Sequence, residues 1–279
     1  MKTTVRTGRS MGSPLRLTLA GARNEEADCG WSLVAATFAR AEHELTRFDP
    51  SSALSQLNVT AGGWVTVPVL LRRALVASWR AFRLSGGRFD PRIIGALEAA
   101  GETAGVPLPP SPARLHPGDR WLELDPRGGR ARVDAPIDLG GIGKGLALRW
   151  AAATLRRRGV RDFLLSAGGD MVASGRGPGG GPWVVGLEDP TGATRPLTTI
   201  GLRDAALATS SVALHPRHLI DPTTSQPAHR RWLSVTVLDA DPAWAEVRSK
   251  VAFLSDREPR GLPPRTIWRV GPDGRLADP

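Results

Sequence analysis

The chain of 279 residues is 41% hydrophobic and carries a formal net charge of +10, so it has enough apolar side chains for a folded core and is not an intrinsically disordered chain. It contains no run approaching about 18 apolar residues, and its basic, polar residues 1–10 lack the apolar segment of a secretory signal, so we expect a cytoplasmic protein that does not insert into a membrane. The positive charge would suit nucleic acid, but the arginines are scattered and are not interleaved with aromatic residues, which disfavours that class of partner.

Hydrophobic periodicity predicts one strand and two helices early in the chain. Leucines alternate with polar or small residues over residues 14–20, which is the period of a half-buried strand. Apolar residues recur three and four apart from Asp28, a helix-capping residue type, as far as Phe48, which predicts an amphipathic helix. A second helix is expected to begin at Pro68 and to end at residues 86–87, which are both glycine.

The rest of the chain mixes short strands with two more helices. Residues 101–119 are rich in proline, which predicts an exposed connection. The expected elements after it are a hairpin over 121–134, a helix over 140–158, strands at 163–166, 183–187, 199–202 and 233–238, a helix over 242–254 and a closing hairpin over 266–276. Because the strands are mainly linked by hairpins, this order predicts an α+β fold with packed helices. We expect residues 1–10 to form a flexible N-terminus and residues 11–279 to form a single domain.

A glycine-rich segment over residues 137–145 lies between a strand and the start of a helix. Glycines allow a ligand to approach the backbone, and free N–H groups at a helix start attract phosphate, to which Lys144 adds a full charge. The segment is not a P-loop, because Asp138 occupies the position of the first glycine and Gly145 follows the lysine where serine or threonine would hold magnesium. A glycine-rich helix start made only for packing remains open as the alternative.

Three further polar segments could carry chemistry. Residues 166–170 end a strand with two glycines and Asp170, which is either a turn or a ligand contact. His218 follows another strand and could be a general base or a structural histidine; its spacing from His215 is seen in metal sites, but no second pair completes a zinc site. Glu246, Ser249 and Lys250 share one face of the last helix. On a solvated helix, Glu246 and Lys250 would simply form an ordinary ion pair.

In their order and spacing, these segments resemble one known family. The matching stretches run from Met11 to about Leu254 and include residues 48–58, 87–91, 138–145, 168–170, 182–183, 208–210 and 218–224. Together they resemble the ApbE family of FAD:protein FMN transferases.

The resemblance implies an α+β fold related to the T-fold, with FAD bound in a cleft and magnesium on its pyrophosphate. It also implies that FMN is transferred to a threonine of a partner flavoprotein, with release of AMP. The residues that it assigns to the FAD site are Met11, Phe48, Phe89, Asp90, Asp138, Lys144 and Ile220. It makes His218 the candidate base for the attacking hydroxyl.

The metal site departs from the family pattern. Relatives use a backbone carbonyl at the position of Gly141 and side chains of Asp and Thr at the positions of Glu246 and Lys250. An ammonium donates hydrogen bonds and does not ligate a metal, so magnesium is lost, shifts toward Ser249, or is replaced by Lys250 itself. We favour the last hypothesis, because lysine occurs only at positions 2, 144 and 250 among the 37 basic residues, and arginine does not replace lysine at every site.

Two further departures keep other functions open. Ser225 stands where relatives often have glycine, and the chain contains no tyrosine, so any aromatic platform for the flavin is Phe48 or a tryptophan. Together with Lys250, Ser225 leaves open an FAD-binding or FAD-hydrolysing relative that has lost transfer to protein. A basic nucleic-acid-binding module is the third possibility.

Overall fold

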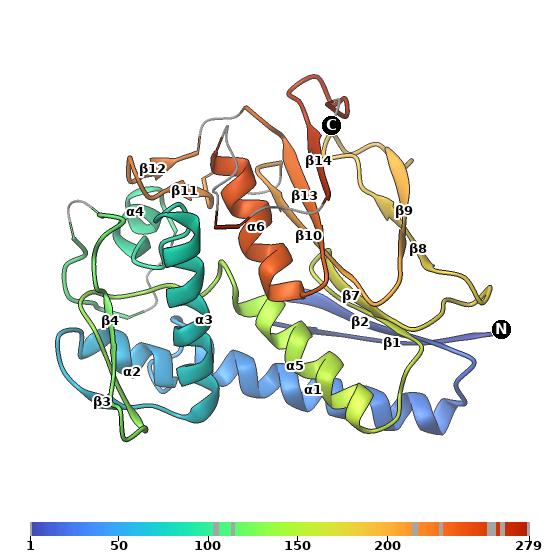
Figure 1. Cartoon of the computed structure of the whole chain (residues 1–279), viewed down its shortest axis with the longest axis horizontal. Helices are drawn as coiled ribbons and strands as arrows, with labels where there is room; N and C mark the ends of the chain where they lie inside the picture. The colour runs from blue at the N-terminus through green and yellow to red at the C-terminus, as the bar shows by residue number, and fades with distance from the viewer. Residues whose placement is uncertain are drawn as a thin grey trace.

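A seven-stranded sheet forms the centre of the protein (Figure 1). The computed structural model describes residues 2–102, 106–112, 115–213, 217–228, 231–255, 261–262 and 266–277. Every neighbouring pair of strands in this sheet is antiparallel. In spatial order the strands are β1 (Thr3–Ser10), β2 (Ser13–Ala20), β6 (Phe163–Ala167), β7 (Asp170–Ser174), β10 (Ala206–Ser211), β13 (Ser234–Asp239) and β14 (Thr266–Val270).

Three helices cover one face of this sheet and a hairpin covers the other. The helices are α1 (Asn24–Leu45), α5 (Gly143–Arg157) and α6 (Pro242–Leu254); α5 contacts both of the others, and Figure 1 shows α5 and α6 in front of the strands and α1 below them. Alternate residues of β6 divide between the faces: Phe163 and Leu165 belong to the core under the helices, whereas Leu164 packs against the hairpin of β8 (Trp183–Leu187) and β9 (Thr198–Leu202). This period of two explains why both faces carry a hydrophobic layer.

A second group of elements lies beside the sheet, on the left of Figure 1. It contains the helices α2 (Ala53–Val59), α3 (Val69–Ser85) and α4 (Ile94–Ala99), and the small sheet of β3 (Val65–Thr66), β5 (Arg130–Val133) and β4 (Leu122–Leu124). Trp121 is fully buried and meets Trp79 and Phe82 of α3 edge-on, at ring-centroid distances of 5.6 and 6.3 Å. The short hairpin of β11 (Ile220–Asp221) and β12 (Gln226–Pro227) lies next to this group. None of the described helices is long and apolar enough to cross a membrane.

The predicted α+β class is confirmed, and most elements lie where the periodicity places them. The helix predicted from Pro68 is α3, which ends at Gly86 in the left-handed conformation (φ 63°) that favours glycine. The last helix matches its predicted bounds, and the side chain of Asp241 caps it by accepting hydrogen bonds from the N–H groups of Ala243 and Trp244. The hairpin of β4 and β5 is also confirmed.

The first helix begins at Asn24, with its N-cap at Arg23, five residues before the predicted cap at Asp28. At its N-cap, the backbone N–H of Arg23 donates to the carboxylate of Glu26 at 2.9 Å, which satisfies this donor from within the first turn. Asp28 does not cap the helix; its carboxylate accepts from Arg6 of β1 at 2.6 Å.

The prediction of a flexible N-terminus is wrong for residues 3–10. They form β1, which pairs with β2 along its whole length, from Thr3 opposite Ala20 to Ser10 opposite Ser13. Its side chains are exposed or half-buried, so the sequence of this edge strand lacks the alternation of apolar and polar residues that would predict it. The helices α2 and α4 were also missed, because six or seven residues show little helical periodicity. The strands β7 and β10 were missed because their residues do not alternate regularly between apolar and polar.

Candidate functional site

A cleft of about 220 Å³ lies between the second group of elements and the end of α6. It brings together segments from five distant parts of the sequence. Eight of the residues singled out from the sequence line it: Phe48, Phe89, Asp90, Asp138, Gly141, His218, Ile220 and Lys250. The other four, Met11, Lys144, Glu246 and Ser249, do not line it.

The glycine-rich loop that forms one wall is fixed by hydrogen bonds from outside the loop. Asn58 of α2 is fully buried and pairs with both backbone groups of Ile137, each at 2.9 Å. The backbone N–H of Asp138 donates to the carbonyl of Pro91 at 2.7 Å, and the carboxylate of Asp138 accepts from Arg47 at 3.1 Å. A loop held in this way keeps its shape before a ligand arrives, which lowers the cost of binding.

Phe48 supplies an exposed aromatic surface at the cleft. The side chain is 56% exposed although it is large and apolar, and the guanidinium of Arg47 lies 4.2 Å from its ring centroid. The same arginine therefore orders both the ring and Asp138. An aromatic face supported on one side is suited to stacking against a planar ring system.

Asp90 lines the cleft, but its carboxylate is committed to Arg92. The two side chains are both 1% exposed and pair at 2.8 Å, and Arg92 also reaches Asp119 at 2.8 Å and Asp134 at 3.3 Å. Burial would lower the pKa of Arg92, but these carboxylates outweigh burial and hold that pKa above its ordinary value. The network therefore fixes the segment that carries Phe89.

Behind the cleft, two lysines meet two buried carboxylates. The Oε1 atom of Glu246 accepts from Lys144 at 3.0 Å and from Lys250 at 3.4 Å, and Lys144 also pairs with Asp170 at 3.2 Å. Glu246 is 1% exposed, whereas the lysines remain 24% and 20% exposed. We call these four residues the lysine–carboxylate cluster, and only Lys250 of the cluster lines the cleft.

The charges of the cluster shift its pKa values in opposite directions. Burial would lower the pKa of Lys144, but Glu246 and Asp170 hold that pKa well above its ordinary value. Burial would raise the pKa of Glu246, but the two lysines and the N–H of Gly145 outweigh it and lower that pKa. Burial raises the pKa of Asp170 in spite of Lys144.

These residues do not fit a magnesium ion as they lie. Both carboxylate oxygens of Glu246 already have donors, because Oε2 accepts from the N–H of Gly145 at 2.8 Å. The hydroxyl of Ser249 is paired with Ser210 at 2.8 Å and donates to the carbonyl of Glu246 at 2.9 Å. Lys250 brings a cation to the place where a ligand would be needed. Within the described ranges, no three His, Cys, Asp or Glu side chains converge as a metal site.

Close packing explains two of the loop glycines. A Cβ atom on Gly141 would lie 2.9 Å from the ring of Phe89 and 3.5 Å from Cδ of Lys250, and one on Gly143 would lie 3.3 Å from Cε of Met11. Packing therefore accounts for both glycines, and Gly141 also lines the cleft, so the two interpretations of this segment do not exclude each other.

Ser225, the serine where relatives often have glycine, adopts a backbone conformation typical of glycine. Ser225 has φ 55°, in the left-handed region where glycine is the usual residue, and its N–H donates to the carbonyl of Asp221 at 2.8 Å. His215, the other histidine of the sequence pattern, lies outside the described residues.

Sequence reasoning gave no role to Arg47, Asn58 or Arg92, which hold the cleft together. Their signal was present but indirect, because Arg47 and Arg92 adjoin matching stretches and Asn58 ends one. A side chain that positions other residues does not belong to a motif with a fixed spacing, so no sequence pattern predicts its role.

Comparisons with known proteins relate the chain to one family. The sequence pattern of the ApbE family matches residues 11–261. An FAD:protein FMN transferase of Rhodobacter capsulatus is 31% identical over 218 residues, which cover 69% of this chain and 40% of that protein. One of Vibrio cholerae is 33% identical over 112 residues, covering 37% and 34%, and one of Klebsiella pneumoniae is 26% identical over 260 residues, covering 84% and 73%. The chain therefore spans less than half the length of the first two relatives.

Solved structures show the same fold at lower sequence identity. The flavin transferase ApbE from Vibrio cholerae superimposes with a TM-score of 0.80 at 20% identity, covering 97% of this chain and 94% of that one. The ApbE protein from Thermotoga maritima superimposes with a TM-score of 0.81 at 22% identity, covering 99% and 96%. With the sequence pattern matched over nearly all of its length and this fold, the chain belongs to the ApbE family.

Proposed function

We propose that this chain is an FAD:protein FMN transferase that cleaves the pyrophosphate of FAD and attaches FMN to a threonine of a partner flavoprotein. The observation that carries the proposal is the cleft, in which Phe48, Asp138, His218 and Lys250 converge from separate segments. Family membership and the names of the relatives support the same reaction.

The reaction requires a base and positive charge. The threonine oxygen attacks the phosphorus of the FMN half, the bond from that phosphorus to the bridging oxygen breaks, and AMP leaves with the electron pair. His218 takes the proton of the attacking hydroxyl. The N–H group of Gly141 and the ammonium of Lys250 neutralise the charge that develops on the phosphoryl oxygens. Phe48 presents its exposed face to the flavin ring.

We further propose that Lys250 takes the place of magnesium in this chain. In relatives, the metal would supply two positive charges beside the pyrophosphate. Here Lys250 lines the cleft as a cation that is held at 3.4 Å by the buried Glu246. The proposal rests on the occupied ligand positions described above and on the rarity of lysine in this arginine-rich chain.

The test follows AMP release and covalent flavin on a candidate acceptor flavoprotein, with FAD, in magnesium or in EDTA. Wild-type activity should be the same in both. Lys250→Met should lower kcat by about 10²–10³-fold, and His218→Ala by about 10²–10⁴-fold. The double variant Glu246→Asp/Lys250→Thr should become dependent on magnesium.

Other outcomes would overturn these assignments. Activity that EDTA abolishes would exclude Lys250 as the replacement cation. AMP release without flavin on any acceptor would favour an FAD-hydrolysing relative. A chain that binds salt-sensitively to DNA and shows no affinity for FAD would remove the transferase proposal altogether.

A further inference from the structure

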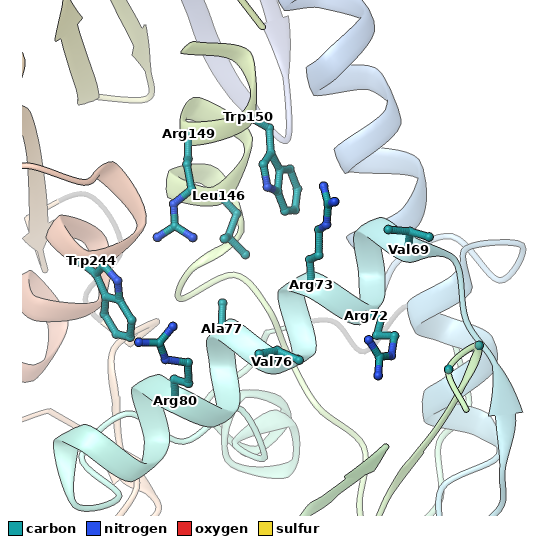
Figure 2. A pocket seen from close by; sticks show the side chains of 12 residues that line it. Val69, Arg72, Arg73, Val76, Ala77, Arg80, Leu146, Arg149, Trp150 and Trp244 are labelled. Atoms are coloured by element: carbon teal, nitrogen blue, oxygen red, sulfur yellow. The ribbon is translucent and has the colours of Figure 1, made fainter. Parts of the chain in front are cut away.

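A groove separate from the cleft runs along α3 (Figure 2). Its larger part, about 680 Å³, lies between α3, α5 and the start of α6. Its smaller part, about 370 Å³, continues between α1, α3 and α5. Both parts are lined by Arg73 and Trp150, so they form one elongated groove. None of the residues that line it also lines the cleft.

The groove is strongly basic. Six arginines line it, Arg40, Arg72, Arg73, Arg80, Arg149 and Arg157, and no aspartate or glutamate is among its lining residues in the described parts of the chain. Arg40 and Arg149 are neutralised from outside the groove, by Glu44 and Asp241. Across the described ranges, no carboxylate lies within ion-pairing distance of Arg72, Arg73 or Arg80. Arg73 and Arg80 therefore leave positive charge along α3 that no described ion pair compensates, whereas Arg72 is near enough to Asp125 to contribute to the lowered pKa of that carboxyl.

Arg72 also carries an unmet hydrogen-bond donor. Its Nε atom is buried and has no hydrogen-bond partner in the described structure. Leaving such a donor without an acceptor costs about 1–3 kcal/mol. Because this atom is buried and Figure 2 shows the Arg72 side chain directed away from Trp150 and Arg149, the unmet donor does not face a ligand in the groove.

Aromatic and aliphatic side chains form the rest of the groove. Figure 2 shows the side chains of Trp150 and Trp244 with Arg73, Arg80 and Arg149 around the same space. Arg80 lies 5.9 Å from the ring centroid of Trp244. Val69, at one end of the groove, is 62% exposed. Such a lining is complementary to a ligand with both carboxylates and apolar side chains.

We propose that this groove docks an acidic, extended segment of the protein that receives FMN. The proposal rests on the proposed transferase function for the identity of the partner, and on the groove for its chemistry. Carboxylates of the segment lie against Arg73 and Arg80, and an apolar side chain packs against Trp150. The extent of the groove along α3, from Val69 to Arg80, favours a peptide segment over a small molecule, because eleven helical steps span about 16 Å.

Two helices connect the groove to the reaction site. On α5, Lys144 belongs to the lysine–carboxylate cluster and Arg149 lines the groove; five residues of helix span about 7–8 Å. On α6, Trp244 lines the groove and Lys250 lines the cleft. A segment docked here therefore holds its protein close to the cleft and raises the local concentration of the threonine.

The test measures binding of a fluorescein-labelled 12-residue peptide of alternating Glu and Ala with a central Leu, by anisotropy, to the full chain. Arg73→Glu/Arg80→Glu should weaken binding at least tenfold, because both side chains are exposed and their replacement by glutamate reverses the charge of the groove. Arg195→Glu/Arg203→Glu is the matched control, since these exposed arginines have the same charge and lie outside the groove. The control should bind within about twofold of wild type.

Several results would overturn the proposal. Equal loss of binding in both double variants would show that only net charge matters, and equal binding of a Gln-for-Glu peptide would exclude recognition of carboxylates. Stronger competition by a 12-nucleotide single-stranded DNA would make nucleic acid the occupant. If the chain sediments as a dimer and Arg73→Glu/Arg80→Glu dissociates this dimer, the occupant of the groove is a second copy of the chain.

Transfer kinetics separate docking from the reaction itself. In Arg73→Glu/Arg80→Glu, KM for the acceptor protein should rise at least tenfold, with kcat and FAD affinity unchanged. An unchanged KM would exclude the acceptor as the occupant. If wild type neither binds FAD nor transfers FMN, the proposed function fails, whereas peptide binding still decides whether the groove takes an acidic segment.

Discussion

Glu246 is the residue on which the positive charges of the site depend. One buried carboxylate holds two ammonium groups and the N–H of Gly145. Without it, Lys144 and Lys250 would repel each other across a partly buried space. The same carboxylate therefore serves the stability of the fold and the position of the proposed catalytic cation.

We predict that Glu246→Gln lowers the free energy of unfolding by about 2–4 kcal/mol. Removing one partner of a buried ion pair costs about 3–5 kcal/mol, and the partial exposure of both lysines reduces this. Urea unfolding at pH 7 measures the change. Glu123→Gln is the control, because its pair with Arg132 is 42% exposed on both sides and should contribute less than about 1 kcal/mol.

The pH dependence of this change has a definite sign. The pKa of Glu246 is lowered from 4.5 in the folded chain, so its stabilising contribution is fully present above pH 4.5 and is lost as the pH falls through the folded pKa. The difference between wild type and Glu246→Gln should therefore narrow below pH 4.5. A difference that stays constant down to the acid transition would contradict this assignment.

Among individual residues, the sequence pointed to those of a rare type, but it did not point to those that position other side chains. Lys250 was found because lysine is rare in the chain, and its contact with Glu246 follows from helical spacing. Arg92 pairs with Asp119 and Asp134, which lie far along the chain. Nothing in one sequence indicates that such distant carboxylates converge on one arginine.

The crossing of α5 and α6 is the contact between elements on which the site depends most directly. Gly145 lies at this crossing, where a Cβ atom would come within 2.6 Å of Cα of Ala243 and of the carbonyl oxygen of Pro242. Both contacts are to backbone, so no side-chain rotation relieves them. The helices must stay close for Glu246 of α6 to reach Lys144 of α5.

We predict that Gly145→Ala lowers the free energy of unfolding by about 1–3 kcal/mol through overpacking. It should also lower FAD affinity, because separation of the helices moves Glu246 away from Lys144. The urea midpoint and FAD titration measure the two effects. Gly118→Ala is the matched control, since its Cβ atom meets nothing within 4 Å and its φ is not positive; if both variants behave alike, helix separation is not the cause.

Elements with a strong period were predictable, and elements fixed by partners were not. The amphipathic α3 and the capped α6 carry their start and stop signals locally. The start of α1 depends on Arg23 and Glu26 in place of the expected Asp28. Strand β1 exists because β2 offers a complete register of partners, which its own sequence does not show.

For the whole molecule, one hydrophobic cluster supports the expectation of a single domain over residues 11–279. The cluster extends from Leu15 of β2 to Leu262 and includes residues of all three helices on the sheet and of α3. A core shared by both groups of elements should be lost in one cooperative step. The sequence predicted the class of this fold but not the order of its strands, which depends on pairings between distant segments.

We predict a single thermal unfolding transition, and we expect FAD to raise the Tm of this transition. At an FAD concentration 100-fold above Kd, binding adds about 2.7 kcal/mol, which corresponds to a rise in Tm of roughly 5–10 °C for a chain of this size. Differential scanning calorimetry measures it. Arg73→Glu/Arg80→Glu should show the same shift; a second transition that FAD leaves in place would mean two domains.

The pairing of β2 with β6 has a consequence for synthesis of the protein on the ribosome. Leu19 pairs with Phe163 and Leu15 with Ala167, so β2 is complete long before its central partner exists. At about 5–20 residues per second, the roughly 140 intervening residues take on the order of 7–30 s to appear. During that interval β1, β2 and α1 can assemble, but one edge of β2 has no strand beside it. The nascent chain therefore presents an open strand edge to chaperones, and to neighbouring nascent chains, until translation has passed β6.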